Sequence, residues 1–230
     1  SLQLQLWIET ISKYLATANK SLQQAAKNTL WLDHAMMAQR SMGHARNAQG
    51  LIPESNEYFL KSIDLAERLV TIEPENKYWQ VELAVTRHNL IKNYLHLGEL
   101  TNATQLLQVS GKGIAEQLAA DTEDVDWQAL ELSNKIYSLQ RLITEEGLAV
   151  ATQSALSILA EGQALFANFP NDSSIAFALC ELYLTLGELE SARGQQTRDS
   201  KYVAKAAGLL NSELLVNSEL RAYWLELAAR

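Results

Sequence analysis

A large side chain recurs every 48 residues along this chain of 230 residues. Trp31, Trp79 and Trp127 stand in one column, and Ile175 and Tyr223 continue it at the same spacing. A period of about 20 to 50 residues is typical of solenoids, whose units bury their apolar faces by stacking on their neighbours. The period therefore predicts a repeat architecture.

Side chains that can cap a helix stand three residues before the anchors, in the column Asn28, Asn76, Asp124 and Asp172. Asn and Asp accept hydrogen bonds from the free N–H groups of a helix's first turn. Each unit is therefore predicted to contain a helix that starts at this column and buries its anchor. Two further columns hold apolar or small residues near the end of each second helix: Leu22, Val70, Leu118 and Phe166, and Ala18, Ala66, Ile114 and Gly162.

The segments between the anchors have the apolar spacing of helices, in steps of three and four residues. Ten Gly, three Pro and 47% apolar residues are typical of helices joined by short loops. Clusters of Gly, Pro, Asn and Asp interrupt this spacing and mark the loops. We therefore expect an all-α chain of about ten helices, at 2–26, 29–49, 54–72, 77–97, 100–120, 125–146, 148–168, 173–193, 200–211 and 218–229.

Three stretches of the sequence resemble the tetratricopeptide repeat. The run Ile-Glu-Pro-Glu-Asn at 72–76 is similar to that family's junction, where a proline ends one hairpin before an aromatic anchor opens the next. Residues 94–100, followed by Ala103, and residues 183–189, followed by Ala192, resemble its hairpin turn, where glycine permits a tight turn. The resemblance implies a right-handed superhelical solenoid of antiparallel helical hairpins over nearly the whole chain.

The unit of 48 residues is longer than the family's unit of about 34 residues. Lengthening each helix by about seven residues, or two turns, accounts for the difference and keeps the apolar faces in phase. From Ile175 to Gly187 there are only 12 residues, against 19 from Trp79 to Gly98. We therefore expect the first helix of the fourth unit to lack the two extra turns.

The predicted layout is one solenoid domain over 1–230. It consists of a half-unit at 1–27, units at 28–75, 76–123, 124–171 and 172–217, and a partial unit at 218–230. Because the chain starts without Met and a helical pattern continues to Arg230, we expect it to be a piece of a longer protein.

The charge and the apolar runs of the chain exclude several classes of function. A net charge of −8 disfavours binding to nucleic acid or to an anionic membrane surface. No run reaches the ~18 to 20 apolar residues of a membrane span, and the start has no signal-peptide pattern. Cys180 has no partner for an internal disulfide and lies in an apolar run, so we expect it to be buried. A cytoplasmic setting is favoured, and a periplasmic or extracytoplasmic one stays open if an anchor lies outside the chain.

The sequence predicts no enzyme, no metal and no cofactor. Its four histidines form no His-Glu-x-x-His motif and have no Cys at ligand spacing. Residues 110–113 (Ser-Gly-Lys-Gly) lack the spacing of a phosphate loop, so close packing on a neighbouring helix explains the glycines better. The acidic residues at 121–126 and 145–146 stand at helix ends, where capping and the helix dipole account for them.

The resemblance also implies that the first helix of each hairpin lines a concave groove. The family's groove positions, carried onto this sequence, select mostly basic and amide residues: Arg40, His44, Gln80, Arg87, His88, Lys92, His96, Gln128, Lys135 and Arg141. Arg87 and Lys135 are 48 residues apart, so stacking should place them side by side, with Lys92 and Arg141 further along the same helices. Four cations would then grip the carboxylates of an acidic peptide segment.

We therefore expect a scaffold that binds a protein or peptide segment within a larger signalling or regulatory protein. Three alternatives remain open. The polar residues are also compatible with a plain solvated face. A deep apolar pocket would favour a sensory domain for a small ligand. A bare apolar face at 220–229 would favour a self-assembly module that forms a homodimer through its open ends.

Overall fold

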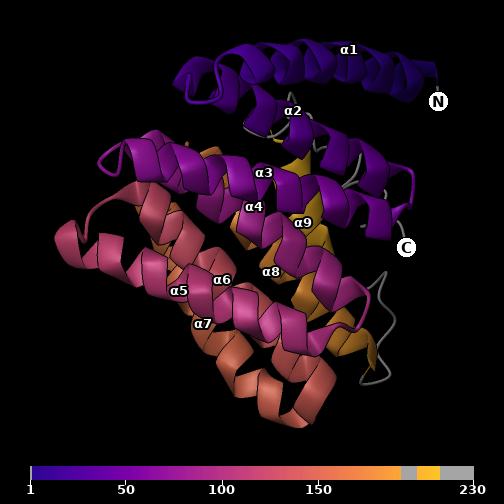
Figure 1. Ribbon diagram of the computed structural model, residues 1–230. Helices are drawn as coiled ribbons and strands as arrows, with labels where there is room; N and C mark the ends of the chain where they lie inside the picture. The colour runs from indigo at the N-terminus through magenta and orange to yellow at the C-terminus, as the bar shows by residue number, and fades with distance from the viewer. Residues whose placement is uncertain (1, 193–200, 213–230) are drawn as a thin grey trace. The chain divides into compact units, whose positions relative to one another are not determined.

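The computed structural model describes residues 2–192 and 201–212, and all of the regular structure in these two ranges is α-helical (Figure 1). The helices are α1 (Leu2–Gln24), α2 (Thr29–Ala48), α3 (Ile52–Ile72), α4 (Lys77–His96), α5 (Leu100–Ala120), α6 (Val125–Glu146), α7 (Leu148–Asn168), α8 (Ser173–Ala192) and α9 (Lys201–Leu210). The predicted all-α class is confirmed, and nine predicted helices agree with these bounds to within two residues. The tenth predicted helix, the apolar face at 220–229 and Tyr223 lie outside the described residues.

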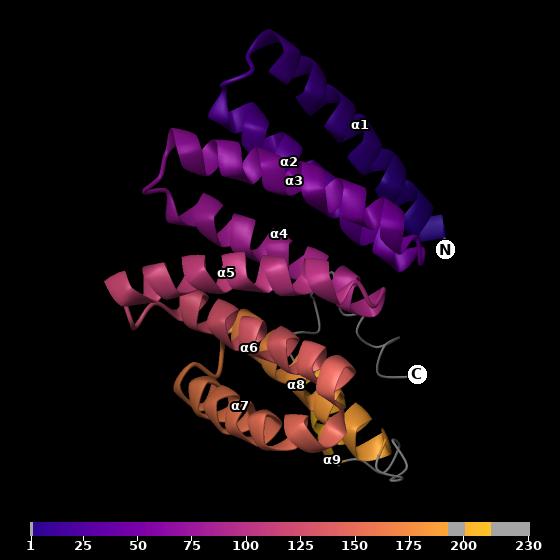
Figure 2. The ribbon, with the colours of Figure 1, turned by 60° about the horizontal axis from the view of Figure 1, so that its bottom comes forward.

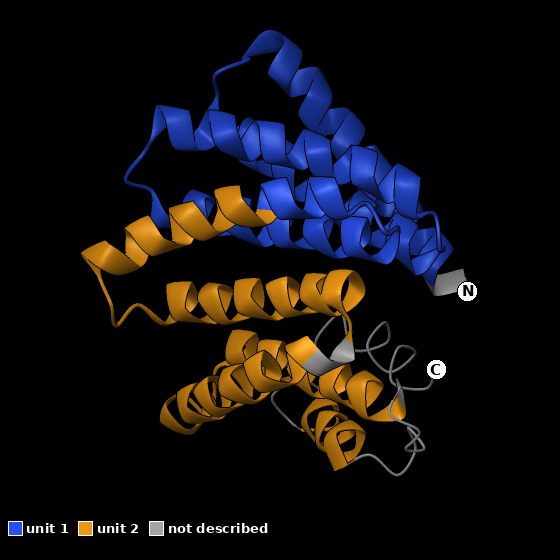
Figure 3. Ribbon diagram, turned by 90° about the horizontal axis from the view of Figure 1, so that it is seen from below, with its two compact units in different colours: residues 1–106 blue, residues 107–230 orange. Residues whose placement is uncertain are grey.

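The described chain divides into two compact units, residues 1–106 and residues 107–230, with the division inside α5 (Figure 3). In the first unit α1 packs on α2, α2 on α3 and α3 on α4, in the order of the chain (Figure 2). In the second unit α6 packs on α7, α7 on α8 and α8 on α9, and α6 also contacts α8. Packing in chain order is what a helical repeat requires. The layout of a single domain with its unit boundaries stays a prediction.

The column of anchors lies in the core, as predicted, except at its first member. Trp79, Trp127 and Ile175 are buried, whereas Trp31 is only half-buried. The second of the two columns of apolar or small residues is buried throughout, at Ala18, Ala66, Ile114 and Gly162. The register of 48 residues therefore identifies equivalent core positions in successive hairpins.

Three of the four predicted caps form. The Asn28 side chain accepts a hydrogen bond from the Trp31 backbone N–H at 3.2 Å. Asp124 accepts bonds from the N–H groups of residues 126 and 127, and Asp172 from those of residues 174 and 175. The prediction is wrong at Asn76, whose side chain makes no cap bond; its Nδ2 donates to the Glu73 carboxylate at 3.2 Å.

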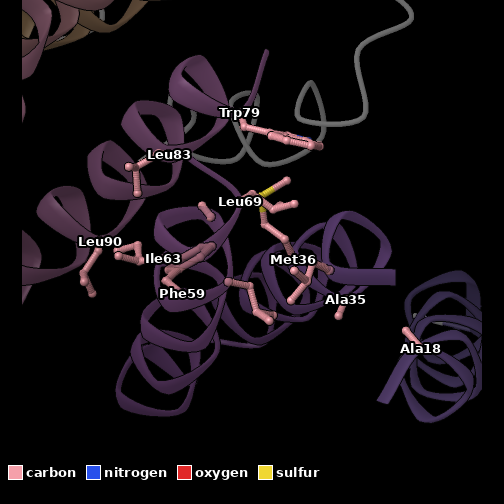
Figure 4. Close-up of a cluster of buried hydrophobic side chains, with 12 residues drawn as sticks. Ala18, Ala35, Met36, Phe59, Ile63, Leu69, Trp79, Leu83 and Leu90 are labelled. Carbon is pink, nitrogen blue, oxygen red and sulfur yellow. The ribbon is translucent and has the colours of Figure 1, made fainter. Parts of the chain in front are cut away.

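The core of the first unit gathers around Phe59, which is fully buried (Figure 4). Gly43 of α2 lets the Phe59 ring of α3 pack against the α2 backbone, because a Cβ at this position would lie 2.5 Å from the ring. Two buried serines of α3 also lie against the α2 backbone. Ser55 Oγ donates to Gly43 O at 2.8 Å, and Ser62 Oγ donates to Met36 O at 2.9 Å. Small residues on both helices thus allow α2 to lie directly on α3.

The expectation of a shortened helix in the fourth unit is wrong. Gly98 does form the predicted turn, with φ of 72°, and Ala103 after it is buried. Gly187, in contrast, lies inside α8, which continues to Ala192 and has 20 residues, as α4 has. Leu186 and Leu189 on either side of Gly187 are buried, so the apolar face of the helix continues past the glycine.

Two other expectations from the sequence are tested directly. Cys180 is buried, as predicted. Of the two glycines at 110–113, Gly111 packs closely, because a Cβ there would lie 2.9 Å from Asn134 Nδ2 of α6, but a Cβ at Gly113 would meet open space. Close packing thus explains only the first glycine.

None of the described helices is long and apolar enough to cross a membrane.

Candidate functional site

The facing edges of α2 and α4 carry a row of polar contacts, which we call the α2/α4 row. These two helices are the first helices of the predicted units 28–75 and 76–123. The contacts of the row join Asp33 to Trp79, Arg40 to Glu82, His44 to Asn89 and Asn47 to Asn93. On α2 the four members are three to seven residues apart, which is the spacing of one helical face.

An ion pair lies near the middle of the row. Arg40 Nη1 donates to Glu82 Oε2, and each of the two side chains is 15% exposed. Burial raises the pKa of Glu82, and the Arg40 guanidinium acts in the opposite direction. Arg40 was predicted to bind a ligand, and the structure shows its charge already compensated from within the chain.

His44 carries no positive charge near neutral pH. Burial lowers its pKa to about 3, and the nearby charges of Arg40 and Lys92 act in the same direction. Its ring packs edge-on against Phe59 with centroids 5.3 Å apart, and its Nε2 lies 3.5 Å from Asn89 Nδ2. His44 can therefore offer a neutral hydrogen-bonding group but not a cation.

A buried amide forms the end of the row, and the sequence analysis missed it. Asn93 Nδ2 lies within hydrogen-bond distance of Asn56 Oδ1 (2.7 Å), Asn47 Oδ1 (3.1 Å) and Ser55 Oγ (3.2 Å), and Asn93 Oδ1 accepts from Asn47 Nδ2 at 3.0 Å. These bonds connect α2, α3 and α4. Buried polar groups with satisfied hydrogen bonds hold their neighbours in one arrangement, so this end of the row is fixed.

The other predicted cations with assigned contacts are also paired within their own units. Arg87 Nη2 lies 2.9 Å from Glu67 Oε1, and Arg141 forms an ion pair with Glu145. Lys135 Nζ lies 2.6 Å from Glu161 and 3.6 Å from Glu131. Burial acts to lower the pKa of Lys135, but these two carboxylates outweigh it, so the pKa is raised.

The proposed frame of four cations spans both units. Arg87 and Lys92 belong to the first unit, and Lys135 and Arg141 to the second. Their placement side by side therefore stays a prediction. His88 is buried, Lys92 is half-buried, and His96 is exposed at the end of α4.

The two predicted glutamines have a structural task. Gln80 Nε2 donates to Pro74 O, and Gln128 Nε2 donates to Thr122 O at 2.7 Å. In both cases the acceptor is the carbonyl six residues earlier, in the loop before the helix. The two glutamines are 48 residues apart, so the repeat uses the same bond to tie each loop to the helix that follows.

The second unit has a shorter polar row between α6 and α8. Tyr137 Oη donates to Glu181 Oε2 at 2.8 Å, and Gln140 Nε2 donates to Thr185 Oγ1 at 2.9 Å. Gln163 of α7 adds a bond to the Tyr183 hydroxyl at 3.1 Å. First helices of successive predicted hairpins therefore meet through polar side chains in both units.

Comparisons of the chain with protein-family models, with curated proteins and with solved structures found no match. Within residues 2–192 and 201–212, no three His, Cys, Asp or Glu side chains gather in a way that could hold a metal ion.

Proposed function

We propose that the chain is a scaffold of the tetratricopeptide-like kind, which holds a segment of another protein across the first helices of its hairpins. In this proposal the chain is a non-catalytic module of a larger signalling or regulatory protein. The observation that supports it most is the α2/α4 row, whose hydrogen-bonding side chains are held in place by one another.

A row fixed in this way suits recognition of a polar segment. Ordering a side chain on binding costs about 0.5 to 1.5 kcal/mol, and this cost is small where contacts within the protein already hold the side chain. The ion pair of Arg40 and Glu82 keeps some exposure, and Tyr78 beside it is largely exposed. A partner can therefore reach the edge of the row without any rearrangement of its buried end.

The paired cations remain compatible with a partner that carries carboxylates. Arg87 is paired with Glu67, which is about half exposed, and Lys135 with Glu161, which is equally exposed. Ion pairs that reach solvent are worth about 0 to 1 kcal/mol, so a partner's carboxylate can take the place of either acid at little cost. Such exchange favours specificity over affinity, and binding should weaken with salt.

Photo-crosslinking tests the scaffold role directly. In cells of the source organism, p-benzoylphenylalanine in place of Tyr78 should crosslink the chain to a discrete protein. The matched control is the same group in place of Leu60, which is equally exposed on α3 of the same unit. Crosslinking that is absent at position 78, or equal at both positions, would contradict binding across α2 and α4.

The partner recovered in this way allows a test of the cations. We expect Arg87→Glu to weaken its binding by about tenfold at low salt, which corresponds to about 1.4 kcal/mol. The double variant Arg87→Glu/Glu67→Arg restores the internal ion pair with its ends exchanged. If the double variant regains full binding, Arg87 has a structural task and does not contact the partner.

A further inference from the structure

Aromatic side chains also stand on α1 and at the start of α2 in the first unit, and two of them, Tyr14 and His34, lie within electrostatic reach of Asp33 of the α2/α4 row. We define this aromatic patch as Trp7 and Tyr14 of α1 with Leu30, Trp31 and His34 of α2. Trp7 is 36% exposed, Tyr14 43% and Leu30 57%. The His34 ring joins the two helices, because its centroid lies 5.5 Å from that of Tyr14 and 5.5 Å from that of Trp31.

The repeat supplies a covered copy of the aromatic patch within the same unit. Counting 48 residues forward from Trp7, Tyr14, Trp31 and His34 leads to Ser55, Ser62, Trp79 and Glu82. All four of these equivalents bond to α2, and their partners are Gly43 O, Met36 O, Asp33 and Arg40. On α3 and α4, therefore, the surface that corresponds to the aromatic patch is covered by a helix.

Two polar groups of the aromatic patch, on Trp31 and His34, could form hydrogen bonds with a helix that covered the patch. Trp31 is half-buried, whereas its equivalent Trp79 is buried and donates from Nε1 to Asp33 at 3.2 Å. His34 Nδ1 is shielded from solvent and has no hydrogen-bond partner in the described part of the chain. A buried ring nitrogen without a partner is unfavourable, so a shift of the His34 ring that brings Nδ1 to a partner's side chain would relieve this cost.

We propose that the aromatic patch docks an acidic α-helix of a partner protein, in the place that α2 occupies on α3 and α4. The residues of this site are not those of the α2/α4 row, so the inference goes beyond the function proposed above. The mode of binding is a helix laid into the angle between two helices, with a few anchoring side chains at fixed spacing.

The contacts of α2 define the chemistry of this partner helix. Asp33, Met36, Arg40 and Gly43 stand at positions i, i+3, i+7 and i+10 of α2. At position i the partner needs a carboxylate to accept from Trp31 Nε1. At i+7 it needs a carboxylate or an amide to bond His34 Nδ1.

Steric demands fix the other two positions of the partner helix. Tyr14 and Trp7 stand where α3 has the small residues Ser62 and Ser55. A helix can approach these rings only where it carries small residues itself. We therefore expect Ala or Gly at both i+3 and i+10.

The charge around the aromatic patch favours an acidic partner. Residues 1–50 contain five Lys and Arg and two Asp and Glu, a net charge of +3 in a chain of −8. Lys20 and Lys27 are exposed, and so is Lys13, which forms an ion pair with Glu9. Complementary charge speeds the encounter of the two surfaces and makes binding sensitive to salt.

A peptide derived from α2 tests the proposal. The probe is a fluorescently labelled peptide with the sequence of residues 28–50 and the changes Met36→Ala, Arg40→Glu and Arg46→Glu. Fluorescence anisotropy with the full chain should show saturable binding that weakens as salt rises. A second peptide with Met36→Trp in place of Met36→Ala should bind at least tenfold more weakly, because its larger side chain meets Tyr14.

A matched pair of protein variants locates the binding. Trp7→Gln/Tyr14→Gln removes the exposed rings while keeping a good helix former, and we expect it to raise the Kd at least tenfold. Leu156→Gln on α7 removes an apolar side chain that is more exposed than either ring, at 52%, and should leave the Kd unchanged. Circular dichroism of both variants should match that of the parent.

Three results would overturn the proposal. The first is no saturable binding of the probe, and the second is equal binding by Trp7→Gln/Tyr14→Gln, since a peptide that displaces α2 itself would not need these rings. The third is a dimer of the parent in analytical ultracentrifugation that the same variant abolishes, because the patch would then be covered by a second copy of the chain. None of these measurements involves Arg87 or Tyr78, so the proposed scaffold role is tested separately.

Discussion

Residues 94–100 and 183–189 share six of their seven amino acids, yet the first stretch contains a turn and the second is helical throughout. The sequences are Tyr-Leu-His-Leu-Gly-Glu-Leu and Tyr-Leu-Thr-Leu-Gly-Glu-Leu. In the first, α4 ends at His96, Gly98 has φ of 72° and α5 begins at Leu100. In the second, Gly187 lies within α8. Nearly the same local sequence is thus compatible with a helix end and with a helix interior.

The end of α4 has the full hydrogen bonding of a glycine-terminated helix. Glu99 N donates to Tyr94 O at 2.8 Å and Gly98 N donates to Leu95 O at 3.1 Å. This pair of bonds is the Schellman motif, which needs a left-handed residue and therefore favours glycine. Leu97, the residue before the glycine, is 39% exposed. Continuing the helix through this segment would therefore gain little from burial against neighbouring helices.

Burial decides the opposite outcome in α8. Leu186 and Leu189 are each only 5% exposed. Burying one leucine side chain contributes about 1.5 to 3 kcal/mol, whereas a glycine within a helix costs about 1 kcal/mol. Two buried leucines therefore outweigh the glycine between them. The comparison shows that burial by neighbouring helices can override the local signal of a glycine, as it does in α8.

The two leucines that precede the glycines give the largest expected difference. Leu186→Ala should lower the free energy of unfolding by about 2 to 5 kcal/mol, because it leaves a cavity in a packed face. Leu97→Ala should lower it by less than about 1 kcal/mol, because the side chain is largely exposed. Urea denaturation of both variants measures the two losses. Equal losses would mean that burial does not distinguish the two stretches.

The one position at which the two stretches differ gives the next largest effect. Thr185 is buried, and its Oγ1 accepts a bond from Gln140 at 2.9 Å and donates to Glu181 O at 3.0 Å. Thr185→His should cost about 1 to 3 kcal/mol, because it overfills the site and leaves Gln140 without this partner. The reverse change at the exposed His96, to Thr, should stay within about 0.5 kcal/mol.

Thermal melts of Thr185→His and His96→Thr, followed by circular dichroism, measure these effects. The melts also separate the effect of the amino acid from the effect of its burial, because the two variants exchange the same pair of amino acids at a buried and an exposed position. A variant His96→Thr that lengthened α4 at the expense of the turn would contradict the argument, since the threonine itself would then favour the longer helix.

The elements that could be predicted from the sequence are those with local signals. The bounds of nine helices, the caps at Asn28, Asp124 and Asp172, and the turn at Gly98 all follow from residues within a few positions of each feature. The shortened helix predicted around Gly187 is wrong for the same reason. The glycine is a local signal, but the burial of its neighbours is a property of other helices.

The candidate site was predicted only in part. The groove positions implied by the resemblance selected Arg40 and Arg87, but the carboxylate partners of these residues lie 42 and 20 residues away in the sequence. Only the packing of the helices identifies these partners. The amide cluster at Asn93 was missed, although Asn47, Asn56 and Asn93 within predicted helices were a usable signal. The aromatic patch was missed because only the structure reveals that Ser55 and Ser62, the equivalents of Trp7 and Tyr14, are covered by α2.

The last pair of expected effects comes from two glycines that differ in backbone conformation, Gly98 in the turn between α4 and α5 and Gly113 inside α5. Gly98→Ala places a Cβ on a residue with φ of 72°, which should cost about 1 to 2 kcal/mol. Gly113 lies inside α5 with an ordinary helical backbone, and a Cβ there would meet no atom within 4 Å. Gly113→Ala should therefore raise the free energy of unfolding by about 0.5 to 1 kcal/mol, because alanine favours the helix.

The same urea titrations should show that the two substitutions change the free energy of unfolding in opposite directions. That result would mean that the turn depends on the left-handed backbone of Gly98. If Gly98→Ala proved neutral, α4 and α5 would have to be joined by a backbone that does not need positive φ. The helix would then be free to continue through residue 98, as α8 does through residue 187. The contrast between the two stretches would then depend on burial alone.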